Sequence, residues 1–385
     1  MRTNWAGNHA YRAARLHRPT TLDELRAVVA AAPSLRALGS RHAFTAIADA
    51  GEQVVLDGLP ADVMLDGDTV SFNAGLTYGE LAEHLEGRAA LHNLASLPHI
   101  SVAGAIGTGT HGSGTGNLAT AVRALELVTS DGEVVTARRG DPDFDGMVVH
   151  LGRLGVLTRL TLDTEPPFAV AQRVFEGLSW EALSEHFDAL FSAAYSVSVF
   201  TRWKDVDMVW LKGRDALPET LYDATPATVE RHPIIELDPV NCTAQLGRPG
   251  PWWDRLPHFR MGFTPSHGAE VQAEYLIPRE HAVAAIQALR ALTLPHLLVS
   301  EIRTIAADAL WMSPAYGRDS VGLHFTLERV PVDGVLRAIE AALAPFDPRP
   351  HPGKLHLKPG TYERADDFET LAARLDPRGA FVAQA

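Results

Sequence analysis

The chain has 385 residues, enough for two or three domains, and its hydrophobic content of 46% is ordinary for a globular protein. The formal net charge of −13 is spread without acidic or basic runs, which disfavours nucleic acid and anionic membranes as partners. The single cysteine, Cys242, excludes an intrachain disulfide and a cysteine-held zinc ion, and we expect no metal site.

The first 19 residues are polar and lack the apolar core of a signal peptide. No apolar run approaches the roughly 20 residues that span a bilayer. We therefore expect a soluble, cytoplasmic protein, and we expect it to be a monomer.

The first helix is predicted in residues 18–33, with a capping box formed by Thr21 and Glu24 and an end at Pro33. Further short elements follow in the chain: a strand running into a glycine turn at 34–44, a meander of strands at 53–75 and a helix at 76–88.

Residues 107–112 read GTGTHG, the spacing of a Rossmann dinucleotide-binding turn. Such a turn leads at once into a helix and then into a parallel strand. Here residues 113–117 are too rich in glycine to start a helix, and residues 122–140 predict a hairpin around Asp131 and Gly132. We favour a backbone cradle that offers N–H groups to a phosphate without a helix dipole, over a Rossmann turn or a loop without ligand.

From about residue 165 the pattern changes to long strands that alternate with amphipathic helices. This pattern predicts a second, α+β domain built on an antiparallel sheet. Strands are predicted at 168–180, 193–204, 206–214, 260–278, 296–308 and 320–330, and helices at 278–292 and 332–346, before a tail of loop and helix at 349–377.

Two of these strands carry pairs of polar residues at a spacing of two. Glu301 and Arg303 share one face, and His324 and Thr326 share another, because side chains alternate along a strand. On neighbouring strands the four would form a polar wall, although an exposed sheet face explains them equally well. His42 and Lys354 lie in turns, where position alone favours a structural histidine and an ordinary loop lysine.

Nearly the whole chain resembles the alditol oxidases (xylitol/sorbitol oxidase type) of the vanillyl-alcohol oxidase flavoprotein superfamily. The stretches that carry the resemblance include LGSRHAF at 38–44, NLASLPHISVAGAIGTGTHGSG at 93–114, PGPWWDRLPHF at 249–259, EIRTIAADALWMSPAYGRD at 301–319 and RPHPGK at 349–354.

The resemblance implies an α+β fold with an FAD-binding domain at 1–165, rejoined by 341–385. It implies a substrate (cap) domain with a large antiparallel sheet at 166–340. Two glycine loops, 38–44 and 101–114, would cradle the FAD pyrophosphate. The implied cofactor-binding residues are Leu38, Gly39, Ser40, Arg41, His42, Ala43, Phe44, Ser96, Ser101, Gly104, Thr108, Gly109, Thr110, His111, Val156 and His351.

His42 matches the family position that bonds covalently to the flavin 8α-methyl carbon. Relatives with two covalent bonds add a cysteine near the second loop, whereas Cys242 is far away in sequence. We therefore expect one covalent bond.

The implied reaction is oxidation of the terminal hydroxyl of an alditol to the aldose, with O2 reduced to H2O2. The implied substrate contacts are Ser96, Glu301, Arg303, His324, Thr326 and Lys354. Arg303 and Lys354 would stabilise alkoxide character, and Glu301 and His324 would act beside them. Glu301 beside Arg303 also avoids an unpaired buried charge.

Three departures from the family pattern lie near the expected site: Arg41 in place of glycine, Pro352 in place of an aromatic residue, and a different C-terminal ending. The alternatives are an aldonolactone or 2-hydroxy-acid oxidoreductase, a flavin-carrying or sugar-binding protein without turnover, and a nicotinamide dehydrogenase.

Overall fold

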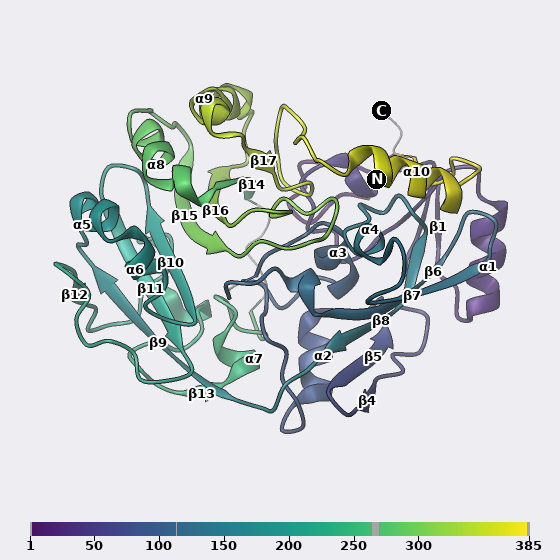
Figure 1. The fold of residues 1–385 in the computed structure, drawn as a ribbon, viewed down its shortest axis with the longest axis horizontal. Coiled ribbons are helices and arrows are strands. Elements are labelled where there is room, and N and C mark those ends of the chain that lie inside the picture. Colours follow the sequence, from purple (N-terminus) through teal and green to yellow (C-terminus); the bar gives the residue numbers. More distant parts are fainter. Residues whose placement is uncertain (1, 113, 264–268, 383–385) are drawn as a thin grey trace.

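The computed structural model describes residues 2–112, 114–263 and 269–382. Two halves stand side by side, one carrying the first strands and helices and the other a large sheet (Figure 1). Among the described residues, no helix is long and apolar enough to cross a membrane.

The first half contains two small sheets. In one, β1 and β2 each pair in parallel with β3, and the other is antiparallel with the order β4-β5-β8-β6-β7. The elements are β1 (Arg15–His17), α1 (Leu22–Ala31), β2 (Leu35–Ala37), η1 (Ala46–Ala48), β3 (Glu52–Val54), β4 (Met64–Asp66), β5 (Thr69–Asn73), α2 (Tyr78–Leu85), α3 (Val102–Gly107), η2 (Leu118–Ala121), β6 (Val122–Val128), β7 (Val134–Arg138), α4 (Phe144–Val148) and β8 (Val156–Asp163).

The second half is built on an antiparallel sheet that joins nine strands in the described part of the chain. Its order is β12-β9-β11-β10-β15-β16-β14-β17, with β13 also paired to β9. The elements are β9 (Ala169–Glu176), α5 (Trp180–Glu185), α6 (Phe187–Phe191), β10 (Ser196–Thr201), β11 (Val206–Gly213), β12 (Thr225–Pro226), η3 (Pro239–Asn241), β13 (Gly250–Pro251), α7 (Trp252–Arg255), β14 (Glu270–Pro278), η4 (Arg279–His281), α8 (Ala282–Arg290), β15 (Leu297–Ile305), β16 (Ser320–Glu328), α9 (Asp333–Leu343), η5 (Ala344–Phe346) and β17 (Arg349–Pro350).

The strands predicted in the second half are confirmed, with one part outside the described residues. Of the strand predicted at 260–278, only β14 (Glu270–Pro278) is observed: residues 260–263 form turn and loop, and residues 264–268 are not described. The predicted helices are observed as α8 and α9, and the tail contains α10 (Ala365–Leu375).

One face of the large sheet is apolar and is covered by helices. Leu323, Phe325 and Leu327 of β16 are fully buried there, in a core shared with Ile286 of α8 and Ile339 of α9. Because side chains alternate, His324 and Thr326 point to the opposite face, as predicted. That opposite face is turned toward the first half.

The last segment of the chain ties the halves together. β17 pairs with β14 in the large sheet, while α10 packs its Phe368 and Leu371 into the core of the first half. In Figure 1 this yellow helix lies beside the N-terminal half. The two cores lie largely on either side of the proposed domain division at residue 165.

Two local predictions are wrong in detail. Thr21 caps α1 by accepting a hydrogen bond from the Glu24 N–H. The Glu24 carboxylate, however, accepts hydrogen bonds from the N–H and hydroxyl of the preceding residue, Thr20, so the reciprocal pair predicted for Thr21 and Glu24 is incomplete. The predicted meander is also divided, because β3 lies in the parallel sheet and only β4 and β5 form a hairpin.

The glycine run differs from a Rossmann turn. The hairpin of β6 and β7 is confirmed, which excludes the parallel strand that a Rossmann turn needs. However, α3 occupies Val102–Gly107 at the start of the run, so its N-terminus lies beside the glycine loops. Residues 108–112 themselves are not helical, so the cradle without a helix dipole stays a prediction for GTGTHG.

Candidate active site

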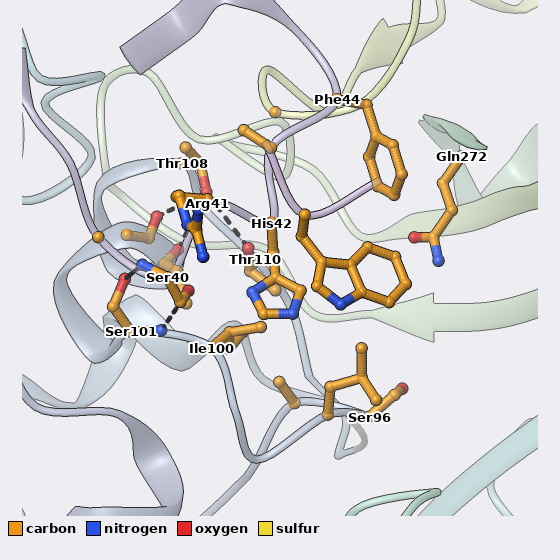
Figure 2. A pocket seen from close by; sticks show the side chains of 18 of the residues that line it. Ser40, Arg41, His42, Phe44, Ser96, Ile100, Ser101, Thr108, Thr110 and Gln272 are labelled. Atoms are coloured by element: carbon orange, nitrogen blue, oxygen red, sulfur yellow. Dashed lines mark hydrogen bonds between the residues drawn. The ribbon is translucent and has the colours of Figure 1, made fainter. Parts of the chain in front are cut away.

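A cavity of about 880 Å³ lies between the polar face of the large sheet and the glycine loops of the first half. This volume is in the upper part of the range for small-molecule and cofactor sites. Its lining includes segments 36–44 and 95–112 from one side and residues of β14, β15 and β16 from the other. Figure 2 shows His42, Ser96 and Gln272 arranged around this pocket.

The two glycine loops approach each other through a pair of serines. The Ser101 N–H donates to Ser40 Oγ at 2.9 Å, a contact drawn in Figure 2. A Cβ on Gly39 would lie 2.3 Å from Ser101 Oγ, and a Cβ on Gly104 would lie 2.7 Å from the same atom. Only glycine leaves room for the Ser101 side chain at both positions, so the two loops can pack against each other at the cavity wall.

Arg41 adopts a left-handed backbone conformation, with φ of 64°. Glycine takes this conformation without strain, which explains the glycine of the resembling family at this position. Here the backbone is held in place because Arg41 O accepts a hydrogen bond from the Trp5 N–H at 2.8 Å.

The His42 ring is buried against Trp5, with ring centroids 5.2 Å apart and planes 25° from parallel. Within the described residues, neither ring nitrogen meets a hydrogen-bond partner. Burial lowers the pKa of His42 to about 4, so the ring is neutral and one of its two nitrogens keeps a free electron pair. Buried polar atoms are seldom left unpaired, and such a nitrogen suits a covalent bond to a cofactor.

The polar wall consists of rows of side chains across three adjacent strands. Glu274 of β14, His324 of β16 and Glu301 of β15 lie directly opposite one another, and Gln272 lies opposite Thr326 in the next row. The strand pairing therefore brings together the residues that the spacing of two had placed on common faces.

Two buried carboxylates organise this wall. Glu301 Oε1 lies 3.0 Å from His258 Nε2 and 3.6 Å from Arg303 Nε. Burial raises the pKa of Glu301, but His258 and Arg303 outweigh it and hold the pKa well below its usual range. Glu274 is the second carboxylate, and it contacts other partners described below.

The imidazoles of the wall are held neutral. Burial lowers the pKa of His258 to about 4 and those of His324 and His351 to about 3. His324 Nε2 lies 3.1 Å from Gln272 Oε1, and His351 Nε2 lies 3.0 Å from Thr110 Oγ1. At neutral pH the wall thus combines ionised carboxylates with uncharged rings that can donate or accept a proton.

Most of the residues that the resemblance implied line this cavity. They are Leu38, Gly39, Ser40, Arg41, His42, Ala43, Phe44, Ser96, Ser101, Gly104, Thr108, Thr110, His111, Glu301, His324, Thr326, His351 and Lys354.

Three implied residues are not part of the cavity lining. Arg303 shares the strand face of Glu301, but its guanidinium is engaged by other parts of the chain: it donates to Gly112 O at 2.7 Å and to Ser196 Oγ at 2.9 Å. Val156 is fully buried in β8 behind the lining, and Gly109 turns the chain with φ of 64°.

Sequence reasoning missed Gln272, Glu274 and His258, all of which line the cavity. Gln272 and Glu274 alternate with apolar residues in β14, so the spacing of two could have identified them. His258 comes from a loop after α7, where no periodic signal exists.

Comparisons with known proteins identify relatives along the whole chain. A family model described as an FAD binding domain matches residues 13–138, and one described as D-arabinono-1,4-lactone oxidase matches residues 268–385. The alditol oxidase of Streptomyces sp. (strain IKD472 / FERM P-14339) is 48% identical over 404 residues, covering 99% of this chain and 96% of the relative. The L-gulono-1,4-lactone dehydrogenase of Mycobacterium tuberculosis (strain ATCC 25618 / H37Rv) is 29% identical, covering 99% and 96%.

Among solved structures, a glucooligosaccharide oxidase from Acremonium strictum, described with a 6-S-cysteinyl, 8α-N1-histidyl FAD, matches with a TM-score of 0.72. Sequence identity is 12%, and the match covers 98% of this chain and 92% of that chain. This likeness concerns the fold, and it confirms the predicted α+β class with an FAD-binding domain and a large antiparallel sheet.

The packing of the glycine loops predicts the effect of one added methyl group. In Gly39→Ala the new Cβ collides with Ser101, so the loops separate and we expect flavin per polypeptide to fall several-fold. Gly334→Ala is the matched control, since a Cβ there meets open space and alanine favours helix α9 by roughly 0.5–1 kcal/mol. Absorbance at the flavin band relative to 280 nm measures both; equal flavin content would contradict the argument.

The neutral imidazoles predict how stability depends on pH. An unfolded histidine binds a proton near pH 6.5, whereas His258, His324 and His351 in the folded state do so only near pH 3–4. A folded pKa below the unfolded one gives stability that is present above the unfolded pKa and is lost as pH falls. We therefore expect the free energy of unfolding to decrease from about pH 6.5 to 5.

Urea unfolding at a series of pH values measures this slope. His258→Gln should make it shallower by up to about 1.4 kcal/mol per pH unit, the contribution of one titrating group. His281, whose side chain is 44% exposed, is changed to glutamine as the control and should leave the slope as in the parent protein. A slope that is identical in all three proteins would refute the assignment.

Proposed function

The chain belongs to the alditol oxidase family, and we propose that it oxidises the terminal hydroxyl of an alditol such as xylitol or sorbitol to the aldose, with O2 reduced to H2O2. The observation that carries the proposal is the polar wall of the large sheet, which faces the same cavity as His42 and the glycine loops. The 48% identity to an alditol oxidase over 99% of the chain supports the same substrate class.

The residues present fit FAD. The close-packed glycine loops suit a pyrophosphate, and the unpaired, buried nitrogens of His42 suit one covalent bond to the flavin. When bound, the flavin supplies a two-electron acceptor that takes hydride from an alcohol carbon and passes the electrons to O2.

The protein's own part is to handle the hydroxyl proton and to orient the polyol. Loss of hydride from carbon requires the attached hydroxyl to lose its proton in or near the same step. His324 is a neutral ring at the cavity surface whose Nε2 is engaged with Gln272, which leaves Nδ1 to accept that proton. Lys354 lines the cavity as well, and its ammonium stabilises negative charge on the hydroxyl oxygen.

Arg303 has a different role in this proposal from the one the resemblance implied. Its guanidinium is bonded to Gly112 O and Ser196 Oγ and stands 3.6 Å from Glu301, so it keeps Glu301 ionised and fixes its direction. Glu301, Ser96 and Thr326 then offer acceptors and donors to neighbouring hydroxyls of the polyol.

We further propose a cytoplasmic protein that works as a monomer. Its one cysteine, Cys242, is buried and free, as suits a reducing compartment. All the site residues named above come from a single chain, so a monomer suffices.

One prediction of the proposed function concerns the covalent bond between His42 and the flavin. Acid precipitation of the holoprotein should carry the yellow colour into the pellet, because a histidyl bond at His42 survives unfolding. His42→Ala should bind the flavin without a bond and release it to the supernatant. Free flavin from the unaltered protein would refute the role of His42.

The second prediction concerns the substrate. A site built to hydrogen-bond several hydroxyls rejects analogues that lack them by about 10⁴-fold or more, because its own buried groups are then left unpaired. We expect kcat/KM to fall by orders of magnitude from xylitol and sorbitol through glycerol to 1,2-propanediol, and glycolate to be poor because Glu301 repels its carboxylate. Peroxide release measures the series.

A lactone or glycolate that outruns every polyol would instead favour the lactone-oxidising alternative. That alternative has support from the family model that matches residues 268–385 and from the mycobacterial relative.

A further inference from the structure

Glu274 lies at the centre of the polar wall, and no motif or resemblance assigned it a role. Its side chain lines the cavity, yet the residue is 3% exposed. Each carboxylate oxygen meets a different partner: Oε1 lies 2.9 Å from His111 Nε2, and Oε2 lies 2.9 Å from Lys354 Nζ. One carboxylate thus holds two basic groups.

The two partners come from distant parts of the chain. His111 ends the glycine run of the first half, and Lys354 lies in the segment after β17. The Glu274 backbone joins them, because Glu274 O accepts a hydrogen bond from the His351 N–H at 2.9 Å. Both segments are therefore docked on a single residue of β14.

The contacts of His111 indicate that its ring is charged. Its Nδ1 lies 2.9 Å from Gly112 O, and its Nε2 faces the Glu274 carboxylate. A carbonyl and an ionised carboxylate only accept hydrogen bonds, so both nitrogens donate and the ring carries two protons. Burial by itself raises the pKa of Glu274, but Lys354 and His111 hold it well below its usual range.

We propose that Glu274 is a positioning residue for the reaction: it aims the Lys354 ammonium at the substrate hydroxyl, supplies its counter-charge, and ties it to His111. The proposal rests on the role of Lys354 in the proposed function. If Glu274 served only to hold the two segments together, it would stabilise the fold but would not affect the charge at the cavity surface.

The other charged and titratable groups of the wall allow a pH profile to report on this contact. From β16 and the C-terminal segment, His324 and His351 face Glu274, and their pKa values are lowered to about 3 by burial. From β15, Glu301 is held ionised by its own partners. Above about pH 5 these three groups keep one charge state, so they do not contribute to an alkaline limb of the profile.

The experiment is a double-mutant cycle on the holoprotein with Glu274→Gln, Lys354→Met and both changes together. The rate of flavin reduction by saturating xylitol is followed in single turnovers across pH, and KM is measured separately. Glu274→Gln should reduce the rate about tenfold with little change in KM, as expected for losing one charged hydrogen bond. Its alkaline limb should move to lower pH.

Lys354→Met should slow flavin reduction by about 10², in line with losing one stabilising donor. Because Glu274 acts through Lys354, the double variant should be no slower than Lys354→Met alone. Rates that multiply instead, or a Glu274→Gln protein with the parent rate and pH profile, would overturn the proposal.

Glu340→Gln is the matched control for a carboxylate that only holds the C-terminal segment in place. Glu340 is a buried carboxylate of α9 that bonds the Tyr275 hydroxyl at 3.0 Å and the Leu357 N–H at 2.7 Å, so it holds the same C-terminal segment outside the cavity. It should keep the parent pH profile. If Glu340→Gln shifted the pH profile as much as Glu274→Gln does, Glu274 would have only the structural role of holding the segment in place.

A readout without turnover separates this proposal from the proposed function. The visible spectrum of the bound flavin is titrated against pH without substrate, and the transition should lie at lower pH in Glu274→Gln than in the parent. If no polyol reduces the flavin, the proposed function fails, while this titration still decides the role of Glu274: an unmoved transition rejects it.

Should Glu274→Gln fold poorly, Glu274→Asp takes its place. The shorter side chain keeps the charge but reaches only one partner, so the rate should fall while the alkaline limb stays where it is. A shifted limb in Glu274→Asp would contradict the proposal.

Discussion

The polar wall of the cavity depends on the pairing of charged side chains that are buried away from water. A buried ion left without a partner costs several kcal/mol, so each charge has to find its counter-ion as the two halves come together. Glu301 meets Arg303 and His258, and Glu274 meets Lys354 and His111. The second pair includes residues from the glycine loop and the C-terminal segment, so the cavity is complete only when these segments dock on the large sheet.

The same requirement explains why the wall is a mixture of ionised carboxylates and neutral rings. Burial, with Lys354 beside it, keeps the His324 ring neutral, whereas His111 has the Glu274 carboxylate as its partner. A neutral ring beside an ammonium is useful for alcohol oxidation, because one group can take a proton while the other stabilises the negative charge that its loss creates.

The sequence could predict on which face of its strand each side chain lies, but it could not predict which residues of the neighbouring strands lie opposite it. Side-chain direction follows from backbone geometry, so the spacing of Glu301 and Arg303 was enough to place them on one face. The register that sets His324 between Glu274 and Glu301 depends on how three strands slide against each other, which no local pattern specifies.

Contacts between distant segments were equally hidden. His111 and Glu274 are 163 residues apart, and β3 pairs in parallel with both β2 and the more distant β1, not with β4, the next strand in the chain. The resemblance to a family supplied the residues of the glycine loops. Their physical reason, the lack of space for a Cβ on Gly39 beside Ser101, became visible only in three dimensions.

A buried lysine outside the cavity also supports the polar wall, and its ammonium is bound by backbone carbonyls in place of a carboxylate. Lys212 of β11 is 1% exposed, and its ammonium donates to the carbonyls of Arg255, Leu256 and Pro257 at 2.6 to 2.9 Å. These carbonyls belong to the last residue of α7 and to the two residues that follow it, where no further turn of helix provides N–H donors for them. His258 follows directly, so the bonds that satisfy Lys212 also fix the ring that binds Glu301. The Glu301 carboxylate, which lines the cavity, is thus oriented with the help of a cation that does not line it.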